Sequence, residues 1–300
     1  MNKLLEIFST RELSLFSWIV IFIIILMFVK SIRTTIWDLV KMLFQKSFLK
    51  IYFILSAYLF LLFYFLNSIN IWDFSYLKDS ILWLFTVGFV LIFKSVQIKD
   101  TTYFKSILKE SLKWTVIFEF IINFYSFNFI IEFLMLPILI MIVTTQAYSE
   151  LDKKNIQVTK LLTNVLSIIG FVFLGFSIYK TIIGYETFFS INTLKIFVLP
   201  IILTILFIPF IYFLSLYSTY ESYFVRLDFM TVKKDEVKVV KKLIKKRANL
   251  HLNRLNRIIE NFDKRVFYDN TNLKEYIEEI SKMQKQPVAN IGYKQCGEKC

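Results

Sequence analysis

Residues 114–148 form one apolar block, WTVIFEFIINFYSFNFIIEFLMLPILIMIVTTQAY. As a single helix these 35 residues would be about 52 Å long, whereas the hydrocarbon core of a bilayer is ~30 Å thick. The block is therefore long for one crossing and short for two. A re-entrant hairpin with its turn near Ser126–Asn128 fits both limits, and a single crossing is the alternative.

Five further apolar segments lie on either side of this block, and four are close to the length of a spanning helix. The segment Ile81–Phe93 is short and needs Ser95–Ile98 to span, with Lys94 reaching toward the interface. Of the 300 residues 56% are hydrophobic, while only 6 Gly and 4 Pro are present, which disfavours a turn-rich β-barrel. The sequence predicts an all-α, polytopic helical membrane bundle with six or seven spans and one possible re-entrant hairpin. The five segments are Leu13–Val29, Ile51–Leu66, Ile81–Phe93, Leu161–Ile183 and Ile196–Tyr217.

The connecting segments differ in charge. Residues 30–50 and 94–113 each carry five Lys or Arg and residues 149–160 carry three, but residues 67–80 and 184–195 carry one each. The positive-inside rule places the basic segments in the cytoplasm of a bacterial inner (plasma) membrane, with the N-terminus outside. We expect a transmembrane domain over 1–217 and a basic helical cytoplasmic domain over 218–300.

Two basic segments, Thr34–Phe48 and Thr101–Trp114, mix apolar residues with Lys. Such helices lie flat on the cytoplasmic leaflet, with tryptophans at the level of the headgroups. Extension of the neighbouring spans explains the pattern equally well.

Polar residues inside the block at 114–148 form the first candidate site. Glu119, Asn123 and Ser126 share one helix face, Asn128 lies in the proposed turn, and Glu132 lies on the second limb. Because charge at bilayer depth is costly, such residues commonly face a bundle interior or a wet cavity. The functional hypothesis is a pore lining or ion pathway. The alternative is a shallow first limb whose carboxylates are protonated or paired.

The C-terminal region contains an apolar stripe that predicts one helix of about eight turns. A stripe of this kind needs a partner helix, and the same helix of a second subunit would make the protein a homo-oligomer. A second helix from Leu273 to Met283, capped by Asn272, is expected to fold back on the first. The stripe comprises Val237, Val240, Ile244, Ala248, Leu252, Leu255, Ile259, Phe262 and Val266.

The same region is strongly basic, with twelve Lys or Arg against four Asp or Glu between Lys233 and Arg265. Three interpretations remain: contact with anionic lipid, binding of an anionic ligand such as a nucleotide or a nucleic-acid oligomer, and a solvated face. The predicted ligand-binding residues are Lys238, Lys241, Lys242, Lys245, Lys246, Arg247, Arg254 and Arg257.

Sequence motifs of enzymes and of metal sites are absent. No phosphate-binding glycine loop, zinc-protease or serine-hydrolase motif occurs. His251 is the only histidine, and Cys296 and Cys300 have no second pair, so we predict no catalytic residues, metal or other cofactor.

The leading functional hypothesis is an oligomeric membrane channel or pore-type effector, regulated through the basic tail. Bacterial antiviral defence effectors share this plan of a membrane bundle with a cytosolic sensor, an analogy of architecture only. One alternative is an anchor or scaffold whose tail recruits a cytosolic protein partner. Another is a small proton-coupled transporter that uses Glu119 and Glu132 as a relay.

Overall fold

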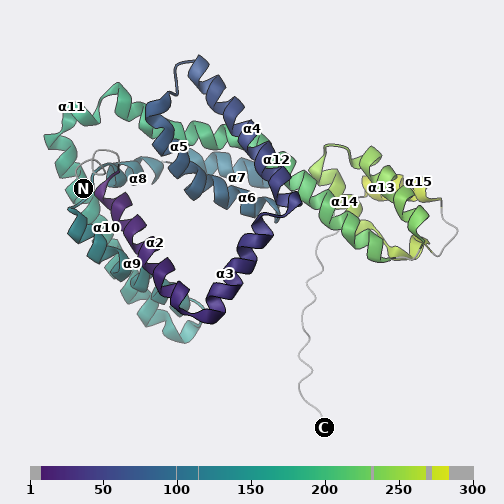
Figure 1. Ribbon diagram of the computed structural model, residues 1–300, viewed down its shortest axis with the longest axis horizontal. Coiled ribbons are helices and arrows are strands. Elements are labelled where there is room, and N and C mark those ends of the chain that lie inside the picture. Colours follow the sequence, from purple (N-terminus) through teal and green to yellow (C-terminus); the bar gives the residue numbers. More distant parts are fainter. Residues whose placement is uncertain (1–7, 99, 114, 231–232, 268–271, 284–300) are drawn as a thin grey trace, which may run out of the picture. The chain divides into compact units, whose positions relative to one another are not determined.

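The computed structural model describes residues 8–98, 100–113, 115–230, 233–267 and 272–283, and the regular elements within these ranges are helices (Figure 1). Six of these helices are long and apolar enough to cross a membrane, which confirms the predicted polytopic bundle. They are Thr10–Phe28, Phe48–Ser68, Phe74–Ser95, Phe129–Ser149, Ile156–Ile183 and Ile191–Met230. Both cysteines lie outside the described residues.

The chain forms two compact units. The first comprises residues 1–74 and 111–199, and the second comprises residues 75–110 and 200–300. The predicted boundary between residues 217 and 218 falls inside the long helix α12 (Ile191–Met230), and it stays a prediction.

The first unit contains a bundle of α2 (Thr10–Phe28), α9 (Phe129–Ser149) and α10 (Ile156–Ile183), in which α9 packs on both others (Figure 1). Helix α10 runs antiparallel to α9, since the Phe127 and Phe176 rings stack 4.0 Å apart at one end. At the other end, Ser149 Oγ lies 2.8 Å from Thr159 Oγ1. A short 3₁₀ turn, Lys153–Asn155, joins the two helices, and the four-residue α11 (Tyr185–Phe188) follows α10.

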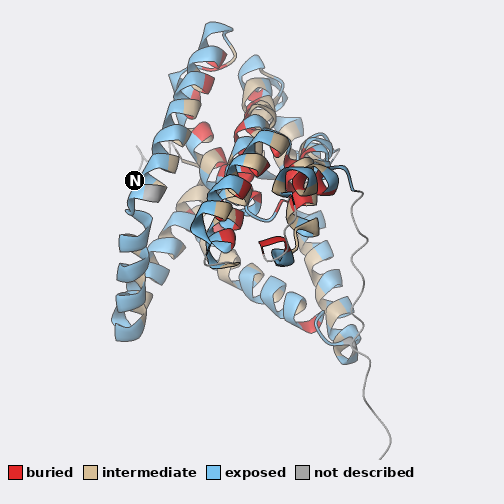
Figure 2. Cartoon of the chain, turned by 90° about the vertical axis from the view of Figure 1, so that its right-hand side faces the viewer, coloured by how far each residue is buried: buried red, intermediate tan, exposed pale blue. Residues whose placement is uncertain are grey.

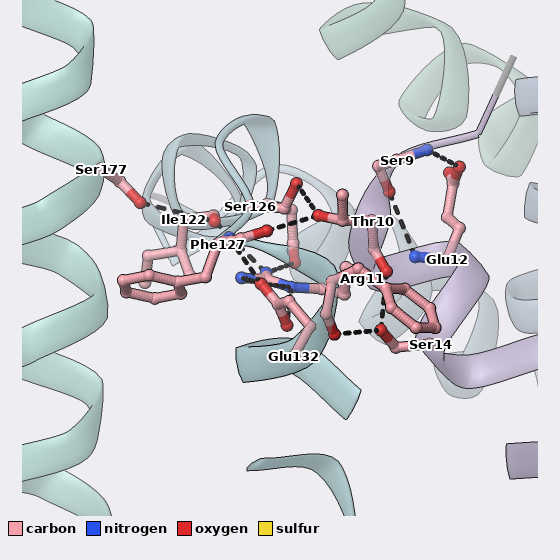
Figure 3. A network of polar contacts seen from close by, with 12 residues as sticks. Ser9, Thr10, Arg11, Glu12, Ser14, Ile122, Ser126, Phe127, Glu132 and Ser177 are labelled. Carbon is pink, nitrogen blue, oxygen red and sulfur yellow. Dashed lines mark hydrogen bonds and ion pairs between the residues drawn. The ribbon is translucent and has the colours of Figure 1, made fainter. Parts of the chain in front are cut away.

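The apolar block at 114–148 is broken where the sequence predicts a turn. Helix α8 (Thr115–Phe124) ends before Tyr125, and α9 begins after Asn128, whose Oδ1 accepts a hydrogen bond from Ile130 N at 3.2 Å. Short polar side chains favour such caps because they compete for backbone donors. With ten residues, α8 is about 15 Å long and cannot cross the hydrocarbon core alone. It lies across the end of the bundle at which α2 and α9 begin (Figures 1 and 3).

A second break separates α2 from α3 (Lys30–Leu43), which is followed by α4 (Lys46–Ser68). Val29 has extended backbone angles, φ −88° and ψ 107°, so the chain changes direction there. Helix α3 is the amphipathic helix expected from Thr34, and it begins four residues earlier.

In the second unit, the predicted short span is a composite helix. Phe74–Tyr76 forms a 3₁₀ turn, and α5 (Leu77–Trp83) passes through a π-helical turn at Leu84–Gly88 into α6 (Phe89–Ser95). Trp83 Nε1 donates to Thr204 Oγ1 of α12 at 2.9 Å, and the next helix is α7 (Thr102–Ser111). Pro200 and Pro209 lie inside α12, which continues past both.

Among the described residues after α12, the C-terminal region contains three α-helices and a 3₁₀ turn at Lys264–Phe267, so the prediction of one long helix is wrong. The chain breaks at Asn249, whose φ of 49° and ψ of −125° end α13 (Lys234–Ala248). Helices α14 (Leu252–Asn261) and α15 (Leu273–Lys282) then pack with α13, and Asn272 caps α15 as predicted. Because α14 and α15 fold back on α13, the apolar stripe is buried within the same chain and needs no second subunit to cover it. Its buried members are Val237, Val240, Ile244, Ala248, Leu252, Leu255 and Val266.

Most spanning helices show exposed residues along much of their length, drawn pale blue in Figure 2. In α2, Ser14 is the one buried residue. An apolar surface of this extent requires a lipid or protein environment.

Candidate functional site

A polar network joins the starts of α2 and α9 to the end of α8 (Figure 3). Arg11 of α2 donates from Nε to both carboxylate oxygens of Glu132 at 3.2 Å, and from Nη2 to Oε1 at 3.1 Å. Its Nη1 reaches Asn123 Oδ1 at 2.8 Å, and its guanidinium lies 5.3 Å from the centre of the Phe173 ring. The Glu132 side chain is 7% exposed, so its charge is balanced inside the protein.

The turn between α8 and α9 is held by the same network. Thr10 Oγ1 donates to Phe127 O at 2.6 Å and lies 2.7 Å from Ser126 Oγ, while Phe127 N donates to Glu132 Oε1 at 3.0 Å. Trp18 Nε1 donates to the O atom of Phe133, the residue after Glu132 on α9, at 2.8 Å. Thr10 of α2 and Glu132 of α9 thus bond polar groups of the turn, and a lone hairpin would lack the contribution of α2.

The structure brings together three of the five residues predicted to line an ion pathway, namely Asn123, Ser126 and Glu132. Asn128 instead caps α9. Glu119 is exposed on α8 and takes no part in the network within the described residues. Glu132 is paired, as in the alternative to an ion pathway. The carboxylate of Glu119 is instead exposed at the end of the bundle.

Sequence reasoning missed Arg11, because its charge had a ready partner in the adjacent Glu12. Glu12 is used elsewhere: its Oε2 accepts from Ser9 N at 2.8 Å, and its own N–H donates to Ser9 Oγ at 3.2 Å, a capping box for α2. One feature of the sequence could have predicted the pair. Burying the charged carboxylate of Glu132 in an apolar helix costs free energy unless a counter-charge lies beside it.

The basic helix α13 forms the second candidate site, and it contacts α12 directly. Lys241 Nζ lies 2.7 Å from both carboxylate oxygens of Asp228 on α12. The ring of Phe224, one turn earlier on α12, lies 5.6 Å from Lys241 Nζ and 5.3 Å from Lys245 Nζ. Two predicted ligand-binding lysines are therefore held on the last membrane helix.

The remaining predicted basic residues differ in their contacts. Arg247 binds Ser281 Oγ at 3.0 Å and Glu278 Oε1 at 3.2 Å on α15, and Arg254 Nη1 donates to Arg247 O at 3.1 Å. Lys242 and Lys246 are exposed and form no ion pair within the described part of the chain. Lys238 pairs with Asp235 at 3.0 Å on the surface, and Arg257 has a buried Nε without a hydrogen-bond partner. Lys242 and Lys246 thus carry open positive charge on α13, as does the exposed Lys234 at the start of the helix.

The loop between α13 and α14 is clamped by α12. Tyr212 Oη donates to Leu250 O at 2.5 Å and accepts from Leu252 N at 3.3 Å. Tyr220 Oη, two turns further along α12, donates to Asn249 O at 2.8 Å. These bonds hold the loop that carries the positive φ of Asn249 against α12.

A second clamp joins the first turn of α14 to the segment before α7. Asn253 Oδ1 accepts from Thr101 N at 3.0 Å, and Asn253 Nδ2 donates to Thr101 Oγ1 at 3.0 Å. The amide satisfies one donor and one acceptor of the same residue, a geometry that fixes its orientation. His251, in the loop between α13 and α14, is exposed.

Ion pairs at the surface of the C-terminal region alter the pKa values of two carboxyl groups. Hydrogen bonding to Lys282, with the added charge of Arg247, lowers the pKa of Glu278. Hydrogen bonds from Arg265 lower the pKa of Asp263. Burial raises the pKa of Tyr276, whose Oη accepts from Asp263 N at 2.7 Å.

The described residues contain no group of three His, Cys, Asp or Glu side chains arranged to hold a metal ion. Comparison with protein-family models, with curated proteins and with solved structures gives no match.

Proposed function

We propose that this integral membrane protein is an oligomeric, cation-conducting channel that is controlled by an anionic ligand bound to its basic C-terminal region. The observation that carries the proposal is the contact between Lys241 and Asp228, 2.7 Å apart, which ties the basic helix α13 to the last spanning helix α12. The ligand-binding lysines and the membrane helix thus share one ion pair.

The ligand controls the channel because it competes with Asp228 for Lys241. A ligand that places phosphate oxygens on Lys242 and Lys246 also attracts Lys241 and Lys245, which lie on the same side of α13 one turn apart. Asp228 and the Phe224 ring hold these two lysines in the free protein. The ligand then binds more tightly to the state in which α12 has released α13, and such a difference in affinity is what shifts a population.

Permeation is assigned to the end of the bundle that carries Glu119. Glu132 is neutralised by Arg11, which leaves Glu119 as the open carboxylate of the apolar block. Repeated around an oligomer, this carboxylate forms a ring of negative charge at a pore mouth, which concentrates cations.

Oligomerisation is supported by the surface of α10. Ser167 and Gly170 are exposed on this spanning helix, and a Cβ built on Gly170 meets no atom within 4 Å. Small residues on a spanning helix allow a second helix to approach closely.

Ion flux from liposomes tests the proposal. Purified protein is reconstituted and challenged with a short single-stranded oligonucleotide, with ATP, or with phosphatidylglycerol in the membrane as separate probes. At least one probe should trigger cation flux. Asp228→Asn should raise flux without a probe, because Lys241 is already released. Absence of flux with every probe, and with Asp228→Asn, would overturn the channel.

Variants separate the two parts of the site. Lys242→Glu with Lys246→Glu should weaken probe binding and leave the Lys241–Asp228 contact in place. Glu119→Gln should lower the preference for cations over anions, and Asn192→Asp, which adds a carboxylate elsewhere, serves as the charge control. Selectivity that is unchanged by Glu119→Gln removes this residue from the pathway.

An anchor that recruits a cytosolic protein is the second candidate, and one observation favours it. A cleft of about 530 Å³ in the C-terminal region is lined by both apolar and polar side chains, among them Met230, Phe262, Asp263 and Tyr276. An anchor would give no ion flux with any of the three probes or with Asp228→Asn, so the liposome experiment separates the two functions.

A further inference from the structure

Helix α3 presents two chemically different faces. At 100° per residue, Ile32, Ile36, Leu39, Val40 and Leu43 share one side, while Lys30, Thr34, Asp38 and Lys41 share the other. None of its residues is buried. On the apolar face, Leu39 and Leu43 are 55% and 48% exposed, whereas Ile32, Ile36 and Val40 are half-buried. The described residues therefore cover the apolar face only in part.

The position of α3 in the chain restricts what covers that face. Its 14 residues make it about 21 Å long, less than the ~30 Å hydrocarbon core, so it does not cross the membrane. Spanning helices adjoin it on both sides, since α2 ends at Phe28 and α4 begins at Lys46. The turn at Val29 sends α3 away from the axis of α2 (Figure 1). Both ends of α3 are thus held at one membrane surface.

The charges around α3 match an anionic surface. Lys30, Arg33 and Lys41 stand against one acid, Asp38, which lies 3.4 Å from Lys41 on the exposed face. Lys30 and Arg33 form no ion pair within the described part of the chain. Charge of this kind next to a spanning helix is attracted to acidic headgroups.

The start of α4 provides an independent indication. Lys46 opens this helix and Lys50 follows one turn later, with no acidic residue in the first turn and no side-chain cap. Positive charge at a helix N-terminus opposes the macrodipole. Phosphate groups at that level offset the conflict, because they accept hydrogen bonds from free N–H groups and balance the lysines.

We infer that α3 is a surface helix that lies in the headgroup layer and binds anionic phospholipid. Lys30, Arg33 and Lys41, with Lys46 and Lys50 at the start of α4, contact the phosphates, and the face of Ile36, Leu39 and Leu43 rests on the acyl chains. This assignment does not depend on ion conduction.

Site-directed spin labels test the orientation of α3 in the full chain. Cys296 and Cys300 are replaced by Ser, and single cysteines are introduced as Thr34→Cys, Leu39→Cys or Leu43→Cys. In vesicles of phosphatidylcholine with phosphatidylglycerol, labels at 39 and 43 should collide with lipid-soluble oxygen. The label at 34 should collide with a water-soluble nickel chelate.

Each other pattern contradicts the inference. Equal exposure of all three labels to the nickel chelate would mean that α3 stands in water. Equal exposure to oxygen would place α3 within the hydrocarbon. Protection of labels 39 and 43 from both reagents would show that a protein surface covers the apolar face.

The requirement for anionic lipid is tested by charge removal. Lys30→Gln, Arg33→Gln and Lys41→Gln are combined, and Lys264→Gln, Lys274→Gln and Lys282→Gln form the matched control with the same change in charge. Each of the three lost contacts should weaken the enrichment of a phosphatidylglycerol probe around the protein about fivefold, so the triple variant should lose more than fivefold. The control should stay at the wild-type level. Equal enrichment in both triple variants overturns the lipid assignment, even if the spin labels show the expected orientation.

Discussion

Arg11 and Glu132 form an ion pair with three nitrogen–oxygen contacts of 3.1 to 3.2 Å, and the pair joins the starts of α2 and α9. Arg11 lies before the apolar core of α2, and Glu132 lies 121 residues later in the chain. The contact therefore links two spanning helices that no neighbouring loop connects.

Glu132→Gln should destabilise the protein, because it leaves the guanidinium of Arg11 without its counter-charge. We expect a loss of about 2–4 kcal/mol, somewhat less than the ~3–5 kcal/mol for one broken partner of a fully buried pair, because the Arg11 side chain is 23% exposed. Glu119→Gln is the matched control and should stay within about 0.5 kcal/mol of wild type, as surface changes do. Thermal unfolding in detergent compares the two. Equal losses would mean that the ion pair contributes no specific stability.

Asn249→Gly should stabilise the C-terminal region. A φ of 49° with ψ of −125° is strained for a residue with a Cβ, and glycine relieves this strain. The expected gain is about 0.5–1 kcal/mol, and Asn249→Val should cost more than this because its side chain is branched at Cβ. Thermal unfolding of both variants checks the order. If Asn249→Gly were less stable than wild type, the backbone at Asn249 would not be strained.

Much of the fold follows from local features of the sequence. Length and hydropathy locate the spanning helices, and the polar residues Ser126 and Asn128 locate the turn in the apolar block. The partner of Glu132 could not be predicted in this way, since its identity depends on how α2 packs against α9. Sequence spacing shows which residues share a helix face, and it does not show which distant segment covers that face.

The tail illustrates the same limit. The spacing of the apolar stripe is continuous through Ala248 and Leu252, so periodicity alone predicts an unbroken helix. The break at Asn249 is favoured by tertiary burial, which places Leu252, Leu255 and Ile258 in a core with α13 and α15. Asparagine tolerates positive φ better than most residues, and that tolerance is the one local sign of the break.

Acid should remove the contribution of Glu278 to stability. Its pKa is lowered by Lys282 and by Arg247, so the folded state holds the ionised carboxylate more strongly than the unfolded state does. The contribution is present above the pKa of about 4.3 of an unfolded glutamate, and it is lost as the pH falls through the lowered value. Thermal unfolding of wild type and of Glu278→Gln should therefore differ at neutral pH and converge in acid.

High salt gives a control for this effect. The pairs of Glu278 are exposed, so salt should screen them and reduce the difference at neutral pH. A difference between Glu278→Gln and wild type that persists in both acid and high salt would show that the side chain acts by packing.

Tyr212→Phe and Tyr220→Phe should uncouple the basic helix from the membrane helix. Each removes a phenol that holds the loop at Asn249 or Leu250, while the lysines of α13 keep their positions for an anionic probe. A hydrogen bond of this kind contributes about 1 kcal/mol to the state in which α12 holds α13, so we expect half-maximal flux at about fivefold lower oligonucleotide concentration. Tyr217→Phe, on an exposed position of α12, controls for the loss of a phenol. A half-maximal concentration that is unchanged or higher in the Tyr212 and Tyr220 variants would contradict the role of the clamp.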